Sequence, residues 1–153
     1  MINLAVVLLA AAAFLVLWIL LLYNVLVRTR NHCKESWADV DTELQRRYDL
    51  IPNLVQTVRG YAAHERETLD AVVAARSAAA ANHGPVDSQA RDENALIGSL
   101  RRLTAVVEAY PDLKADAHFR ELQAQLAITE DRIQRARRFY NANVRDMNNQ
   151  VES

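Results

Sequence analysis

The side chains that could hold a metal ion in this chain are four histidines and the carboxylates near them. Helical proteins often build two-metal sites from Glu-x-x-His pairs, so the residue three positions before each histidine is decisive. These residues are Thr29, Tyr61, Ala80 and Ala115, and none is a carboxylate. His64-Glu65 begins like the helix of a zinc protease, but Thr68 stands where the second histidine would be. The spacing predicts no metal site and no other cofactor.

The other common kinds of site also lack their residues. Cys33 is alone, and the glycines at positions 60, 84 and 98 form no phosphate-binding loop. A basic cluster, Arg132, Arg135, Arg137 and Arg138, could contact phosphates or anionic lipids, but Glu130 and Asp131 favour a solvated face. The formal net charge is −1, and no aromatic residues alternate with basic ones. We expect no enzyme, no small-molecule substrate and no nucleic-acid partner.

The first element of the chain is an apolar run from Leu4 to Leu22, and the first charged side chain is Arg28. At a rise of about 1.5 Å per residue, Leu4 to Val25 spans roughly 30 Å, the apolar thickness of a bilayer. A cleaved signal peptide would need a basic start, a shorter apolar core and small residues at its end. We therefore predict a retained transmembrane helix in residues 1–27.

Basic residues flank this span on one side. Arg28, Arg30 and Lys34 follow it, whereas only Met1, Ile2 and Asn3 precede it. Because Lys and Arg are enriched in cytoplasmic flanks, we expect a single pass with the N-terminus outside and residues 28–153 in the cytoplasm.

Beyond the span, apolar residues recur every three or four positions, which is the period of packed helices. The segments with such a stripe are about 24–48, 50–81, 88–109 and 113–151. The last stripe, from Phe119 to Val151, is the most regular and predicts a long packed helix. The low content of glycine and proline, three of each, agrees with an all-α fold.

Three breaks separate these segments. Asn82–Pro85 combines a helix-ending glycine with a following proline. At Tyr110–Asp112, proline displaces the preceding residue from the helical region and Asp112 can cap the next helix. At the third break, Asp49 can cap a helix whose first turn contains Pro52, where the missing N–H costs little.

Two packings fit these breaks. A compact up-and-down bundle turns at all three of them. A long two-helix hairpin reverses only at Gly84 and leaves Pro52 and Pro111 as kinks. Four apolar stripes enclose a core better than two, which favours the bundle, but the spacing leaves both arrangements open.

The chain resembles the LemA family of bacterial membrane proteins. The match starts with "YNVLVRTRNHCKESWADVDTELQRRYDLIPNLVQTVRGYAAHERETLDAVVAAR" and resumes with "LTAVVEAYPDLKADAHFRELQAQLAITEDRIQRARRFYNANV". The block "RRYDLIPNLV" is the most diagnostic part. The resemblance implies an N-terminal transmembrane helix that continues into a long antiparallel up-and-down four-helix bundle, located at the bacterial inner membrane. It implies no reaction. In some genomes such genes lie beside one for a membrane metalloprotease.

Polar residues close to the apolar stripes are the candidate functional residues. Arg46, Arg47, Asp49, Pro52 and Asn53 are expected at the membrane-distal tip of the first hairpin, with Asp41 and Asn53 buried. There they either fix the register of the helices or form a surface for docking a partner.

The function predicted from the sequence is a non-catalytic helical scaffold of the cell envelope, anchored in the lipid bilayer. Self-association is expected because the alanines at 10–13 permit close approach of two spans. The alternative is an accessory or sensor subunit of a membrane protease or envelope-stress system, with a membrane protein as its partner.

Overall fold

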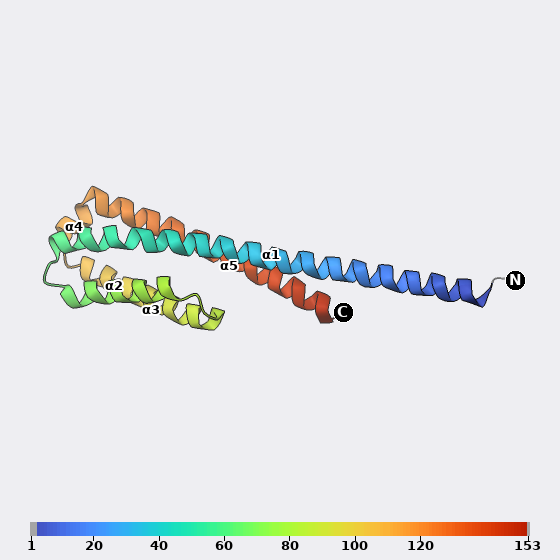
Figure 1. The fold of residues 1–153 in the computed structure, drawn as a ribbon. Helices are drawn as coiled ribbons and strands as arrows, with labels where there is room; N and C mark the ends of the chain where they lie inside the picture. The colour runs from blue at the N-terminus through green and yellow to red at the C-terminus, as the bar shows by residue number, and fades with distance from the viewer. Residues whose placement is uncertain (1–2, 153) are drawn as a thin grey trace. The chain divides into compact units, whose positions relative to one another are not determined.

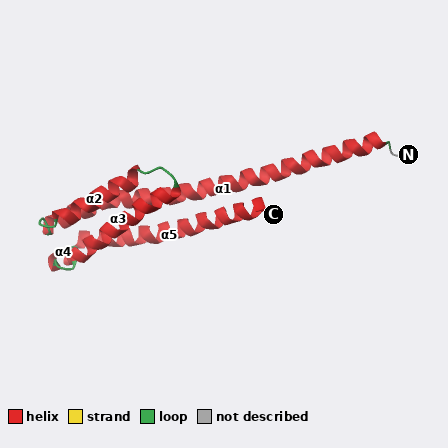
Figure 2. Cartoon of the chain, turned by 90° about the horizontal axis from the view of Figure 1, so that it is seen from below, coloured by secondary structure: helices red, strands yellow, loops and turns green. Residues whose placement is uncertain are grey.

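The computed structural model describes residues 3–152, and every regular element in that range is a helix (Figures 1 and 2). The helices are α1 (Leu4–Tyr61), α2 (Arg66–Ala81), α3 (Val86–Val107), α4 (Pro111–Ala115) and α5 (Ala117–Glu152). The predicted all-α class with a long apolar N-terminal helix is confirmed. Met1, Ile2 and Ser153, at the outer ends of the predicted span and body, lie outside the described residues.

Two compact units share these helices, and α1 and α5 each contribute to both. The first unit comprises residues 1–40 and 135–153, and the second comprises residues 41–134. The predicted boundary between residues 27 and 28 follows hydropathy rather than packing, and it stays a prediction.

In the first unit, α1 is long and apolar enough to cross a membrane, as judged from its length and composition. Its large apolar side chains from Val6 to Val27 are exposed, and Leu9 and Phe14 are each 71% exposed. A contiguous apolar surface of this kind is rare on soluble proteins, where it usually marks a contact with membrane or protein. Lipid is the expected environment of this part of α1.

The rest of the first unit pairs α1 with the end of α5. The rings of Trp37 and Tyr140 have centroids 5.0 Å apart and planes tilted by 59°, a favoured aromatic geometry. The Thr29 hydroxyl donates to Gln150 Oε1 at 2.7 Å. The ring contact and the hydrogen bond join the part of α1 that follows the apolar stretch to the end of α5.

The second unit contains the main apolar core. Each of its five helical segments contributes buried side chains, among them Ile51, Leu54, Val58, Leu69, Val72, Leu96, Leu103, Leu113, Phe119 and Ile133. α2 and α3 lie side by side (Figures 1 and 2). The turn between them is held by Asn82, whose side chain donates to Ser88 Oγ at 2.8 Å and accepts from the Gly84 N–H at 2.9 Å. The break predicted at Asn82–Pro85 is therefore confirmed.

The break predicted at Asp49 is wrong. α1 continues through Pro52 to Tyr61, and the turn lies at residues 62–65, so the segments 24–48 and 50–81 do not exist as separate helices. The turn begins where the Ala62 N–H donates to the Val58 carbonyl at 2.8 Å and closes where Glu65 N–H donates to Ala62. As in the two-helix alternative, Pro52 lies inside a helix, but a second reversal at residues 62–65 distinguishes the structure from that arrangement.

The start of the last helix also differs from the prediction. Pro111 begins the short α4 rather than a helix over 113–151, and α5 starts only at Ala117. Asp116, not Asp112, caps α5, because its Oδ1 accepts from the Phe119 N–H at 2.7 Å. α3 runs from Val86 to Val107, which lies within two residues of the predicted 88–109.

Candidate functional site

Arg47 of α1 lies at the centre of a buried ionic cluster in the second unit, which we call the Arg47 cluster: Arg47, Tyr48, Glu93 and Glu130. The guanidinium forms an ion pair with Glu93 of α3, and its Nη1 donates to Oε2 of Glu130 of α5 at 2.9 Å. The Tyr48 hydroxyl donates to Oε1 of Glu93. Arg47 is 1% exposed and Glu93 is 2% exposed. One cation therefore joins three helices.

The local sequence places these side chains inward. Arg47 follows Leu44 by three residues and precedes Ile51 by four, so it occupies the buried stripe of α1. Glu93 lies one turn before Leu96 in the stripe of α3, whereas Glu130, which follows the buried Thr129, is half-buried at the edge of the cluster. The planar guanidinium suits this position, because it presents a fork of donors that one ammonium group cannot reproduce.

The two carboxylates of the cluster have partners within or beside it. Glu130 accepts from Arg47 at one oxygen and from Gln134 Nε2 at the other, at 3.1 Å. Glu93 accepts from Tyr48 and is paired with Arg47. A buried ion pair is not a strong source of stability, but losing one partner leaves an uncompensated charge. The expected effect of the cluster is to penalise any helix register that separates its members.

The structure does not bring the other predicted site residues to this cluster. Arg46 is exposed and its Nε lies 3.7 Å from Glu43 Oε2. Asp49 is exposed and its Oδ1 accepts from the Gln45 amide at 2.8 Å. Asn53 and Asp41 are also exposed, which corrects the expectation that they are buried. None of these residues lies at a hairpin tip, because the turn is at residues 62–65.

Pro52 creates a distinct contact between α1 and α2. Proline has no N–H, so the carbonyl of Tyr48, four residues earlier, loses its usual helical partner. Nε of Arg76, on α2, donates to that carbonyl at 3.1 Å. Arg76 therefore satisfies the acceptor that Pro52 leaves open, and a tertiary hydrogen bond replaces a helical one.

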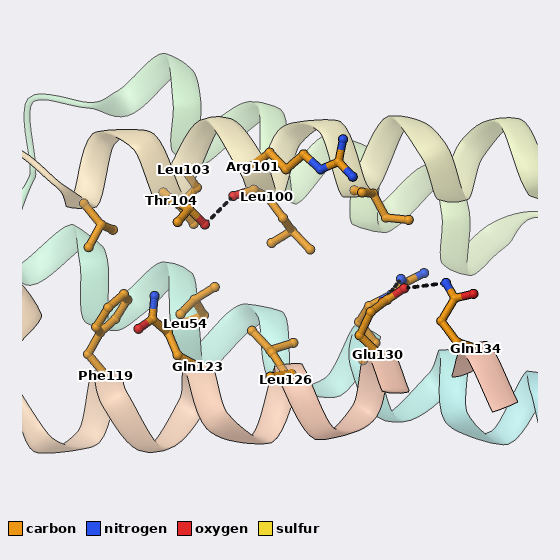
Figure 3. Close-up of a pocket in the computed structure, with 14 residues that line it drawn as sticks. Leu54, Leu100, Arg101, Leu103, Thr104, Phe119, Gln123, Leu126, Glu130 and Gln134 are labelled. Atoms are coloured by element: carbon orange, nitrogen blue, oxygen red, sulfur yellow. Dashed lines mark hydrogen bonds and ion pairs between the residues drawn. The ribbon is translucent and has the colours of Figure 1, made fainter. Parts of the chain in front are cut away.

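An elongated groove of about 440 Å³ runs between α3 and α5 in the second unit (Figure 3). Its apolar lining includes Leu54, Leu100, Leu103, Val107, Phe119 and Leu126. Its polar lining consists of Arg47, Arg101, Thr104, Gln123, Glu130 and Gln134. Figure 3 shows Phe119 and Leu103 toward one end, and Glu130 and Gln134 at the other.

Two tyrosines connect the turn at residues 62–65 to the segment around α4. The Tyr61 hydroxyl donates to Asp116 Oδ2 at 3.0 Å, and the Tyr110 hydroxyl donates to Glu65 Oε1 at 3.2 Å. The Phe119 N–H and the Tyr61 hydroxyl hold the pKa of Asp116 below its usual value. The hydrogen bond to Asp116 and its charge raise the pKa of Tyr61, while burial and Glu65 raise that of Tyr110.

Within residues 3–152, no three His, Cys, Asp or Glu side chains gather as a metal-binding group would require. In the basic cluster, Arg132 Nη1 lies 3.9 Å from Glu43 Oε1, and Glu130 is engaged by Arg47. The sequence reasoning missed Glu93 and the role of Glu130. A charged residue inside an apolar stripe was the available signal for Glu93.

Comparison with known proteins gives one family match. The model of the LemA family matches residues 36–153 of the chain. No curated protein shows a significant match.

Proposed function

The chain belongs to the LemA family, and we propose that it is a non-catalytic, membrane-anchored helical scaffold that self-associates. The observation that carries this proposal is the continuity of α1. A single helix supplies both the exposed apolar stretch from Val6 to Val27 and one wall of the buried core around Ile51. The apolar stretch and this wall of the core are therefore parts of one element of the chain.

The proposed body is an antiparallel up-and-down bundle of α1, α2, α3 and α5. Support comes from contacts that join these helices within the second unit. Arg47 links α1 to α3 and α5, and Arg76 links α2 to α1. Arg47 is almost fully buried and has little freedom to find other partners, as expected for a scaffold with one fixed register.

The proposed topology is a single pass through the bacterial inner membrane, with the N-terminus outside and the body in the cytoplasm. Arg28, Arg30 and Lys34 support it, since all three follow the apolar stretch and are exposed. Self-association through the span is supported by Ala10–Ala13, where small side chains allow two helices to approach closely.

Chemical crosslinking in native membranes, followed by sizing, tests the scaffold role. A ladder of multiples of this chain is the expected result. A product that contains one copy and one foreign membrane protein would instead favour the accessory-subunit alternative and contradict self-association.

A further inference from the structure

We propose that the groove between α3 and α5 binds a long-chain fatty acid, with the alkyl chain along the apolar lining and the carboxylate at Arg101. This ligand is bound and not transformed, and it is additional to the scaffold role. It also adds a small molecule where the residue pattern alone predicts none.

The size of the groove limits its occupant. Its volume of about 440 Å³ lies in the range of about 300–1,000 Å³ that is usual for small-molecule sites. The lining of α3 from Ile97 to Val107 extends over roughly 15 Å at the helical rise. A groove of this volume and length suits one alkyl chain.

The polar groups of the groove identify the charge of the head group. Both oxygens of Glu130 already accept hydrogen bonds, from Arg47 and Gln134. Thr104 donates to the Leu100 carbonyl at 3.0 Å. Arg101 lines the groove, is exposed, and has no ion-pair partner among residues 3–152. A guanidinium binds a carboxylate through two parallel N–H···O bonds, so the open position favours an anion.

A bilayer is a reservoir of such amphiphiles, and α1 carries the predicted span. Fatty acids that leave the membrane would therefore be present at high local concentration near this protein. One guanidinium matches one carboxylate, and a volume of about 440 Å³ suits one alkyl chain better than the two chains of a phospholipid.

The test uses the full chain in lipid nanodiscs, because detergents would compete for the groove. A photoactivatable palmitate analogue is crosslinked to the protein, and the labelled residues are mapped by mass spectrometry. Ala127→Trp and Thr104→Trp fill the groove from α5 and α3, respectively, from exposed positions on its lining. Ala124→Trp is the matched control, since Ala124 is exposed on α5 and does not line the groove.

A second pair of variants tests the head group. Arg101→Ala should weaken competition by unlabelled oleate about tenfold or more, as expected for losing a hydrogen-bonded charge pair. Arg102→Ala is the control, because Arg102 is the neighbouring exposed arginine and does not line the groove. It should leave the competition by oleate unchanged. Circular dichroism of each variant confirms that it is folded.

The expected result is saturable labelling of residues such as Leu100 and Leu126, abolished by both groove-filling variants and retained in Ala124→Trp. Labelling confined to α1, or unchanged by Ala127→Trp and Thr104→Trp, would overturn the proposal. Equal competition by oleyl alcohol and oleate would overturn the role of Arg101. Loss of oligomers in the groove-filling variants, without labelling of the wild type, would assign the groove to a second copy.

Discussion

At the scale of single residues, Arg47 should be the most sensitive position of the second unit. Arg47→Ala leaves Glu93 buried beside a second carboxylate with no guanidinium between them. Removing one partner of a buried pair costs about 3–5 kcal/mol, and in a chain of this size the melting temperature should fall by about 10 °C. Thermal unfolding of the full chain in nanodiscs, followed by circular dichroism, measures this change.

The neighbouring Arg46→Ala is the control for this experiment. Arg46 is exposed and its ion pair with Glu43 is on the surface. Arg46→Ala should therefore change the free energy of unfolding by less than about 0.5 kcal/mol. Equal melting temperatures for both variants would mean that the Arg47 cluster does not hold the helices together.

Asp116 should make the second unit sensitive to acid. The Phe119 N–H and the Tyr61 hydroxyl lower the pKa of Asp116 from its ordinary value of 3.8. The folded state therefore gains stability from this carboxylate above about pH 3.8, and loses it as the pH falls through the lower pKa of the folded protein. As the pH falls below about 3.8, the melting temperature of the wild type should decrease more than that of Asp116→Asn. Parallel pH profiles for the two proteins would contradict this role.

Tyr61 makes the complementary contribution at alkaline pH. Its pKa is raised above 10.0 by Asp116, so the stability it contributes is present below pH 10.0 and is lost as the pH rises through the higher pKa of the folded protein. Tyr61→Phe should reduce the loss of stability above pH 10.0 to the part that Tyr110 contributes, while preserving the N-cap of α5. The same series of melting curves, extended above pH 10, tests the effect. If the melting temperature of Tyr61→Phe followed that of the wild type at every pH, Tyr61 would not be a source of the alkaline loss of stability.

At the scale of elements, the hydrogen bond from Arg76 to the Tyr48 carbonyl explains how α1 continues through Pro52. Arg76→Ala should destabilise the wild type by about 1–3 kcal/mol, because it leaves the Tyr48 carbonyl without its donor. In a Pro52→Ala background, the new N–H at position 52 can satisfy that carbonyl, so Arg76→Ala should cost about 1 kcal/mol less. Urea unfolding of the four proteins of this cycle measures the coupling.

Arg66→Ala, at an exposed position of α2, is the matched control for Arg76→Ala. Its effect should be small and independent of the residue at position 52. Strict additivity between Pro52→Ala and Arg76→Ala would disprove the compensation.

The elements whose ends depend on local signals could be predicted from the sequence. Asn82–Pro85 carries its own turn chemistry, and α3 lies within two residues of its expected position. The passage of α1 through Pro52 could not be predicted in the same way, because the donor that permits it lies on another helix. Asp116 illustrates a second limit: two aspartates near Pro111 can each cap a helix, and only packing selects between them.

The candidate site was predictable only in part, for a related reason. Arg47 stood out as one of several charged residues next to an apolar stripe, but its partners lie far along the chain. Periodicity indicates which face of a helix is buried and does not indicate which residues meet across helices. For this reason the sequence alone groups Arg46 and Asp49 with Arg47, although the structure separates their roles.

At the scale of the whole molecule, the orientation in the membrane follows from the charges after the span. In a Cys33→Ala background, a single cysteine at Asn3 should react with a membrane-impermeant thiol reagent in spheroplasts. A cysteine at the exposed Asp87 should react only after the membrane is permeabilised. The reverse pattern would place the helical body outside and would overturn the proposed topology.

Self-association of the anchored chain is the central claim, and co-capture of two copies tests it most directly. Two full-length copies with different tags are expressed together, crosslinked in the membrane, and captured through one tag. The second tag should be recovered at multiples of the 17.3 kDa chain, and replacing Ala10–Ala13 by leucine should reduce its recovery. A control with Val6, Val7 and Val16 changed to leucine should behave as the wild type. Recovery of the first tag alone, at the mass of one chain or with a single foreign protein, would contradict the claim.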